Sequence, residues 1–297
     1  MTVEVGGMMG AGVAALVAGL ALARGRFAAA SGAGKILALG PVFEAVPLAV
    51  FAAEHFTVAR EMAPIVPHWL PWHLFWVYFV GAALLAAAIS FIVWRHVRWS
   101  AALLALLFLI IVITIDLPNM PRHVHDRIFW TLTLRETVFA GGAMVLAASV
   151  RSRRSLAGTA LGRIGRVIVG AVMIFYGIEH FLFPRFVTGV PLEKPTPAWM
   201  PAPVAIAWVV GITLVVAGVA LLVGFRVRMA AAGAGIVLLL LVVCFYGPLL
   251  VSEFHTDPVE GLNYFADTLL FAGTVLLAGL EAGQAGVSGT GIGGVRD

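Results

Sequence analysis

The sequence predicts an all-α fold, a polytopic membrane helix bundle of about nine transmembrane helices. Hydrophobic residues make up 61% of the chain, charged residues 11%, and the mean hydropathy is +1.02. A soluble domain carries roughly 25% charged residues, about twice this share. Several apolar runs exceed about 18 residues, which is long enough to cross a bilayer as helices. Because these runs are continuously apolar rather than alternating, they exclude a transmembrane barrel.

The apolar runs are separated by short loops that contain arginine, proline or glycine. The first run is rich in glycine and alanine, which makes it the weakest of the predicted helices. The predicted helices run over 4–23, 37–57, 73–94, 99–118, 127–149, 164–183, 202–224, 228–250 and 262–281.

The basic residues predict the orientation of the chain. Thirteen Lys and Arg residues fall in loops on one face of the predicted bundle and five on the other. Positive loops face the cytoplasm, so we expect a multi-pass protein of a bacterial cytoplasmic (inner) membrane, with the N-terminus outside and the C-terminus cytoplasmic. The net charge of +4 reflects these loops. It does not indicate a nucleic-acid partner, and the first residues lack the basic start of a cleaved signal peptide.

An internal repeat divides the chain. Residues 81–118 align with 211–248 without a gap, and AEHF (53–56) aligns with IEHF (178–181). Each half holds four predicted helices, an even number, so the two repeats are parallel. The predicted domains are an extra N-terminal helix with a basic loop (1–36), a first four-helix unit (37–150), a basic cytoplasmic linker (151–163), a second four-helix unit (164–282) and a flexible Gly-rich tail (283–297).

Ionisable side chains inside the apolar runs are the candidate site. At a rise of about 1.5 Å per residue they fall in the outer half of the membrane, and we expect one cluster per half from its first, third and fourth helices. The second half has no arginine opposite Glu179 and Asp267, so a bound proton or cation is expected there. The candidates for binding and proton exchange are Glu54, His55, Asp116, Arg135, Glu136, Tyr176, Glu179, His180, Tyr246 and Asp267.

Two interpretations of these clusters stay open with equal weight. They could brace the bundle by pairing across helices, or they could form a binding or catalytic site, since intramembrane charges are usually functional. Metal binding is a weaker hypothesis. His123 and His125 form an H-x-H in one outer loop and His255 lies in the corresponding loop of the second half, but two histidines without a fixed third ligand make a metal unlikely. The single cysteine, Cys244, excludes an intrachain disulfide.

Several short motifs recur in both halves. YGIEHF (176–181), PAWMP (197–201) and NYFADTLLFAG (263–273) have counterparts in FAAEHF (51–56), PHWLP (67–71) and WTLTLRETVFAG (130–141). This pattern resembles the DoxX-like superfamily of small bacterial membrane proteins. The resemblance implies a four-helix bundle per unit, here fused in tandem. It also implies an association with membrane redox systems, such as a thiosulfate:quinone oxidoreductase. A single cysteine does not support a thiol relay.

Three functions compete at this point. The first is a quinone- or lipid-linked redox protein, or a membrane subunit of a redox complex, with a quinone as the possible cofactor and a redox protein as the possible partner. The second is a structural or assembly subunit without chemistry. The third is a proton-coupled small-molecule transporter, with Glu44 extending the polar track inward. The sequence names neither the substrate nor the oligomeric state, so whether the protein is an enzyme stays open.

Overall fold

The computed structural model describes residues 2–150, 156–254 and 256–280. It is 81% helical and its described residues contain no β-strand, which confirms the all-α helix bundle. Eight helices of the described part are long and apolar enough to cross a membrane. The predicted helix at 127–149 is present but is not among these eight, since it carries several charged residues. His255, the predicted tail and part of the predicted linker lie outside the described residues.

The observed helices agree closely with the predicted ones, except that the second predicted helix is split and two others end in short turns. The helices are α1 (Val3–Ala29), α2 (Gly34–Leu37), α3 (Gly40–Thr57), α4 (Ala59–Met62), α5 (His73–Val93), α6 (Val97–Ile111), α7 (Leu117–Asn119), α8 (Arg127–Ser149), α9 (Leu156–Leu182), α10 (Pro203–Val223), α11 (Val227–Leu241), α12 (Gly247–Glu253) and α13 (Pro258–Ala278). Helix α9 begins at Leu156 rather than at residue 164, so part of the predicted linker is helical.

Two helix starts have the same cap. The side chain of Asp126 accepts hydrogen bonds from the backbone N–H of Ile128 and Phe129 at the start of α8. Asp257 accepts one from the N–H of Glu260 at the start of α13. An aspartate at this position satisfies free backbone donors and complements the positive end of the helix dipole. Both helices begin at the end of the bundle where α3 and α9 finish, since Arg127 bonds Glu179 and Asn263 bonds Glu54 there. We call this the Glu-His end.

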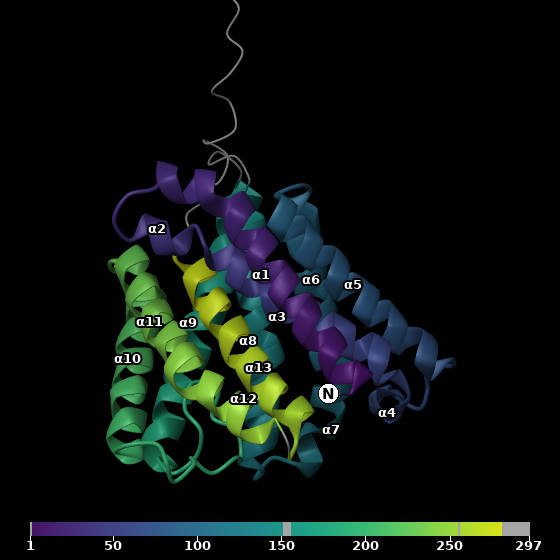
Figure 1. Ribbon diagram of the computed structural model, residues 1–297. Coiled ribbons are helices and arrows are strands. Elements are labelled where there is room, and N and C mark those ends of the chain that lie inside the picture. The colour runs from purple at the N-terminus through teal and green to yellow at the C-terminus, as the bar shows by residue number, and fades with distance from the viewer. Residues whose placement is uncertain (1, 151–155, 255, 281–297) are drawn as a thin grey trace, which may run out of the picture.

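Eight long helices pack as a closed ring, with α1 outside it against α3 and α5 (Figure 1). The order around the ring is α3, α5, α6, α8, α9, α10, α11, α13 and back to α3. The fourth helix of each half therefore packs on the first helix of the other half. The two halves are therefore in contact through α8 and α9 and through α13 and α3.

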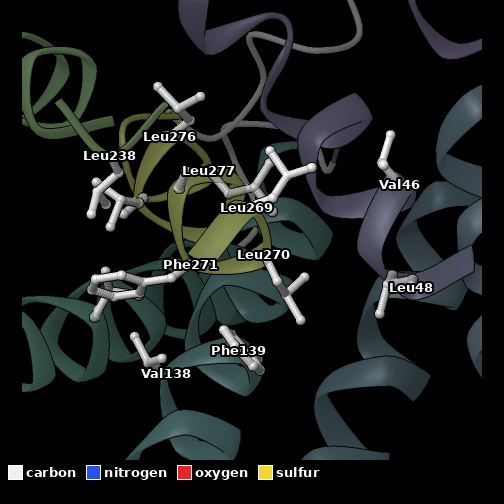
Figure 2. Close-up of a cluster of buried hydrophobic side chains, with 14 of the residues drawn as sticks. Val46, Leu48, Val138, Phe139, Leu238, Leu269, Leu270, Phe271, Leu276 and Leu277 are labelled. Atoms are coloured by element: carbon white, nitrogen blue, oxygen red, sulfur yellow. The ribbon is translucent and has the colours of Figure 1, made fainter. Parts of the chain in front are cut away.

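Helices α8 and α13 also contact each other, so α13 packs on three long helices, α3, α8 and α11. Leu269, Leu270 and Phe271 are buried on successive faces of α13. In Figure 2 the side chains of α13 point in several directions, toward α8, α3 and α11. A helix that is apolar all round is expected in the core of a bundle.

The backbone of the two halves matches in detail. Helices α5 and α10 both have 21 residues, and α6 and α11 both have 15. Both α6 and α11 continue into a five-residue π-helical turn, η2 (Val112–Asp116) and η4 (Val242–Tyr246). These turns begin 130 residues apart, the same offset as the sequence repeat. Such turns are rare and often lie at functional sites.

Candidate binding site

A cavity of about 330 Å³ lies in the first half, between α3, α5, α6, α8 and α13. Its walls are apolar, with Phe51, Leu84 and Phe139 among them. Its polar residues are Glu54 and His55 from α3, Arg135 and Glu136 from α8, and Asn263 and Asp267 from α13. Ligand pockets commonly measure about 300–1,000 Å³ and place a few polar groups in an apolar wall. The cavity fits that description.

Arg135 organises the charges of the cavity. Its Nε and Nη2 donate to Oε1 of Glu136 at 3.2 and 2.8 Å, and its Nη1 donates to Oδ2 of Asp267 at 2.8 Å. Glu136 follows Arg135 directly on α8, whereas Asp267 lies on α13 in the second half. One guanidinium thus pairs with two carboxylates, one from each half, through charge-assisted hydrogen bonds.

Glu54 and His55 face this cavity from the last turns of α3. Oε1 of Glu54 accepts a hydrogen bond from Nδ2 of Asn263 at 2.8 Å. Nδ1 of His55 lies 2.7 Å from the carbonyl oxygen of Phe51. A carbonyl only accepts, so this nitrogen carries the proton and Nε2 of a neutral His55 is a free acceptor. Gly81 of α5 allows the close approach, since a Cβ there would lie 2.8 Å from Cβ of His55.

Asp116 lies beside the cavity at the end of the π-helical turn η2. It is not one of the lining residues, but its carboxylate interacts electrostatically with Glu136 and Arg135. Its Oδ2 is buried and has no hydrogen-bond partner among the described residues. The same holds for Oε2 of Glu136 and Oδ1 of Asn263. The unsatisfied atoms around the cavity are therefore all acceptors.

The corresponding region of the second half is filled by its own chain. Residues 183–202, which we call the plug, connect α9 to α10 and form a β-bridge between Phe186 and Pro195. Val187, Thr188 and Val190 at its tip are each 1% exposed. Gly189, between them, packs against Thr268 and Leu238. The second-half counterparts of the first-half cavity residues are also buried, namely Tyr176, Glu179, His180, Val210, Leu214, Leu238 and Leu241.

Backbone groups of the plug satisfy the polar residues of the second half. The N–H of Gly189 donates to Nε2 of His180 at 2.8 Å, and Tyr246 Oη donates to the carbonyl of Thr188 at 2.6 Å. Nδ1 of His180 bonds the carbonyl of Tyr176, as its counterpart His55 bonds that of Phe51. Gly189 has φ of 105°, a conformation that favours glycine.

Arg127 of the first half holds the plug in place. Its Nη1 donates to Oε2 of Glu179 at 3.1 Å and to the carbonyl of Pro191 at 2.8 Å. Its guanidinium also lies over the rings of Phe183 and Phe186. Glu179 therefore has a counter-charge from the first half, which the sequence did not predict. Asp267 pairs with Arg135, since α13 packs on α8 as well as on α11.

A second hollow lies beside the cavity, at the start of α13. It measures about 360 Å³ and is lined by Asp257, Glu260 and Tyr264, together with Arg135, Asn263 and Asp267. The last three residues also line the first cavity, so they form a wall between the two hollows. The rim is tied by Lys194 of the plug, whose Nζ lies 2.7 Å from Glu253 and 2.8 Å from Glu260.

The predicted site residues thus fall into three groups. Glu54, His55, Arg135, Glu136 and Asp267 line one cavity, and Asp116 adjoins it. Glu179, His180 and Tyr246 contact Arg127 or the plug. Tyr176 donates to the carbonyl of Thr131 at 2.9 Å and braces α9 against α8. Arg127 and Asn263 were not predicted as site residues, because polar residues are common near the start of a helix, and they lie in the first turn of α8 and the second turn of α13.

The weaker metal candidates have other contacts. His123 lies 3.7 Å from Asp126 and stacks on Phe129. Within the described residues, no group of three or more His, Cys, Asp or Glu side chains is placed to hold a metal ion. Glu44 is fully buried, accepts a hydrogen bond from Thr274 and lines neither of the two hollows described above.

Two family models match separate segments of the chain. Residues 162–247 match the DoxX family, and residues 45–128 match a domain of unknown function (DUF8561). No curated protein and no solved structure matches the chain. The DoxX match together with the apolar helices supports an integral, multi-pass membrane protein of DoxX type, embedded in a lipid bilayer.

Proposed function

We propose that the first-half cavity binds the head group of an amphiphilic small molecule, a quinone or a lipid, within a membrane redox system. The observation that carries this proposal is the difference between the halves. The same constellation of glutamate and histidine is plugged by the chain's own backbone in the second half and left as a cavity of about 330 Å³ in the first. A buried polar group without a hydrogen-bond partner destabilises the fold, and a bound ligand removes that cost by supplying the partner.

The roles of the residues follow from their positions. Glu54 and His55 contact the head and exchange protons with it, since a histidine can gain or lose a proton near neutral pH. Arg135 holds the carboxylates of Glu136 and Asp267 in place. The neighbouring hollow, with Asp257 and Glu260 at its mouth, supplies the route by which protons reach this wall from the water outside.

We also propose that the chain is a tandem of two DoxX-like units, over 37–150 and 164–282, with exchanged fourth helices. The matching π-helical turns and the equal lengths of α5 and α10 support this proposal. The charge asymmetry supports an orientation with the Glu-His end on the outer face of a bacterial cytoplasmic membrane. The N-terminus would then lie outside and the C-terminus in the cytoplasm.

A structural role is the second candidate, and one observation favours it for part of the cluster. The bonds Arg127–Glu179, Arg135–Asp267 and Asn263–Glu54 all join one half to the other. They brace the ring whether or not a ligand binds. Arg127, Glu179 and Tyr176 therefore belong to this brace, and Glu54, His55 and Glu136 to the ligand site.

The experiment that tests the proposed function is a pair of matched tryptophan variants. Ile111 lines the cavity, and its counterpart Leu241 lines an apolar groove between α10 and α11. The protein and its Ile111→Trp and Leu241→Trp variants are purified in mild detergent, checked by gel filtration, and extracted for mass spectrometry of bound quinones and lipids. We expect an amphiphile at near-equal ratio to the wild type and to Leu241→Trp, and its loss from Ile111→Trp. An amphiphile that Ile111→Trp retains would contradict the proposal.

A further inference from the structure

From the same cavity we infer that its ligand carries a hydrogen-bond-donating head, with an O–H or N–H directed at Nε2 of His55. This inference rests on the proposed function and names the class of ligand that the site takes. It separates a hydroquinone or an alkyl amine, which donate, from an oxidised quinone, which only accepts.

The first step is an account of donors and acceptors in the cavity. Each guanidinium nitrogen of Arg135 donates one N–H to a carboxylate, Nδ2 of Asn263 donates one N–H to Glu54, and Nδ1 of His55 donates to Phe51. The second N–H of Nη1, Nη2 and Nδ2 remains, so the polar wall offers donors as well as the acceptors Oε2 of Glu136 and Oδ1 of Asn263. The group that decides the head of the ligand is therefore Nε2 of His55, which a ligand that brings only acceptors would leave unpaired.

The second step is the plug, which acts as an internal surrogate for the ligand. At His180 the group that meets Nε2 is a donor, the backbone N–H of Gly189. His180 and His55 have the same ring orientation, since each bonds the carbonyl four residues earlier through Nδ1. By this correspondence the ligand's donor occupies, at His55, the place that the Gly189 amide takes at His180.

The third step concerns the position next to that donor. In the second half, Tyr246 donates to the carbonyl of Thr188, so the plug presents an acceptor there. In the first half the residue at the end of the matching π-helical turn is Asp116, whose Oδ2 is unpartnered. A phenol donates to an acceptor, whereas an ionised carboxylate needs a donor as its partner. Because Asp116 adjoins the cavity without lining it, the donor that the ligand must supply is the one at His55, as in a hydroxybenzene or an ammonium group.

The test compares four decyl-chain probes on the wild-type protein in nanodiscs, with dissociation constants from equilibrium dialysis. They are decylhydroquinone, kept reduced under anaerobic ascorbate, its dimethyl ether, decylquinone and decylamine. We expect a donating probe to bind at least about tenfold more tightly than the ether and the quinone, since an unpaired buried acceptor costs roughly 1–3 kcal/mol. Preference for decylhydroquinone points to hydroxyl donors, and preference for decylamine to a cationic head; both support the inference.

Two results overturn the inference in distinguishable ways. Equal or tighter binding of the ether or the quinone would show that the cavity binds amphiphiles without requiring a donor, and the proposed function would stand. Absence of binding by all four probes would overturn the proposed function as well. A His55→Ala variant sharpens the first comparison, because it removes the free acceptor. We expect it to lower the affinity for the donating probe about tenfold and leave that for the ether unchanged.

Discussion

The two halves of this protein share second and third helices of equal length and a Glu-His pair, yet a cavity borders the pair in the first half and the plug fills that place in the second. The five additional residues that distinguish the second-half connection from the first, EKPTP at 193–197, lie in the plug. These residues connect the buried tip of the plug to α10. The tip itself, residues 187–190, is buried beside His180. In the first half the shorter connection forms α4 and leaves the cavity. The longer connection thus fills the site beside the second Glu-His pair, and the shorter one leaves a cavity beside the first.

The largest expected effect comes from the residue that joins the halves. Arg135→Ala leaves the carboxylates of Glu136 and Asp267 without their shared counter-charge. Breaking such a buried pair costs about 3–5 kcal/mol, so we expect a large fall in the free energy of unfolding. Thermal denaturation in detergent measures it, with the exposed Arg185→Ala as the control. Equal midpoints for the two variants would show that the halves do not depend on this pair.

A second prediction compares the two histidines. His180→Ala leaves the N–H of Gly189 unpaired and opens a cavity beside the plug, so a loss of about 3 kcal/mol in unfolding free energy is expected. His55→Ala removes a side chain that borders an existing cavity and should cost less than about 1 kcal/mol. Denaturation curves of both variants test the asymmetry, and a larger loss from His55→Ala would reverse the assignment of open and closed halves.

A third prediction concerns the tip of the plug. At Gly189 a side chain would have to adopt φ of 105°, and its Cβ would lie 3.0 Å from Cγ2 of Thr268. We expect Gly189→Ala to destabilise the protein by about 1–3 kcal/mol. Gly233 has no neighbouring atom within 4 Å of an added Cβ, so Gly233→Ala is the matched control and should stabilise α11 slightly. Equal changes in the free energy of unfolding for Gly189→Ala and Gly233→Ala would show that the plug does not hold the described conformation.

The smallest effect on stability is expected at Lys194, on the rim of the second hollow. Burial alone would lower the pKa of Lys194, but its hydrogen bonds with Glu253 and Glu260 raise the pKa above the usual value. The stabilisation is therefore present at neutral pH and is lost as the pH rises above about 10.4. Lys194→Met should cost less than about 1 kcal/mol at pH 7, because partly exposed pairs contribute little. Denaturation at pH 7 and above pH 11 checks this, and a difference between the proteins that grows with pH would contradict it.

The sequence predicted the elements of the fold well and their assembly poorly. Continuous apolar runs define the helices, and the prediction of 127–149 matches α8 at both ends. The contacts of α8 with α9 and of α13 with α3 could not be predicted from the sequence, since hydropathy does not say which neighbour a helix packs against. Glu54, His55 and Arg135 were found because ionisable residues are rare in such runs. The plug was missed because its residues are those of an ordinary loop.

The central difference between the halves is an open cavity beside His55 and a filled site beside His180. Cysteine accessibility tests this difference most directly. Met62 lines the cavity, and its counterpart Val187 is 1% exposed in the plug. The single native cysteine is replaced in a Cys244→Ser background, and Met62→Cys and Val187→Cys are labelled with a small maleimide in nanodiscs. We predict labelling of Met62→Cys at least about tenfold faster, since Val187→Cys reacts only after local opening. Equal rates would show that the two halves are equally open, and would contradict the account.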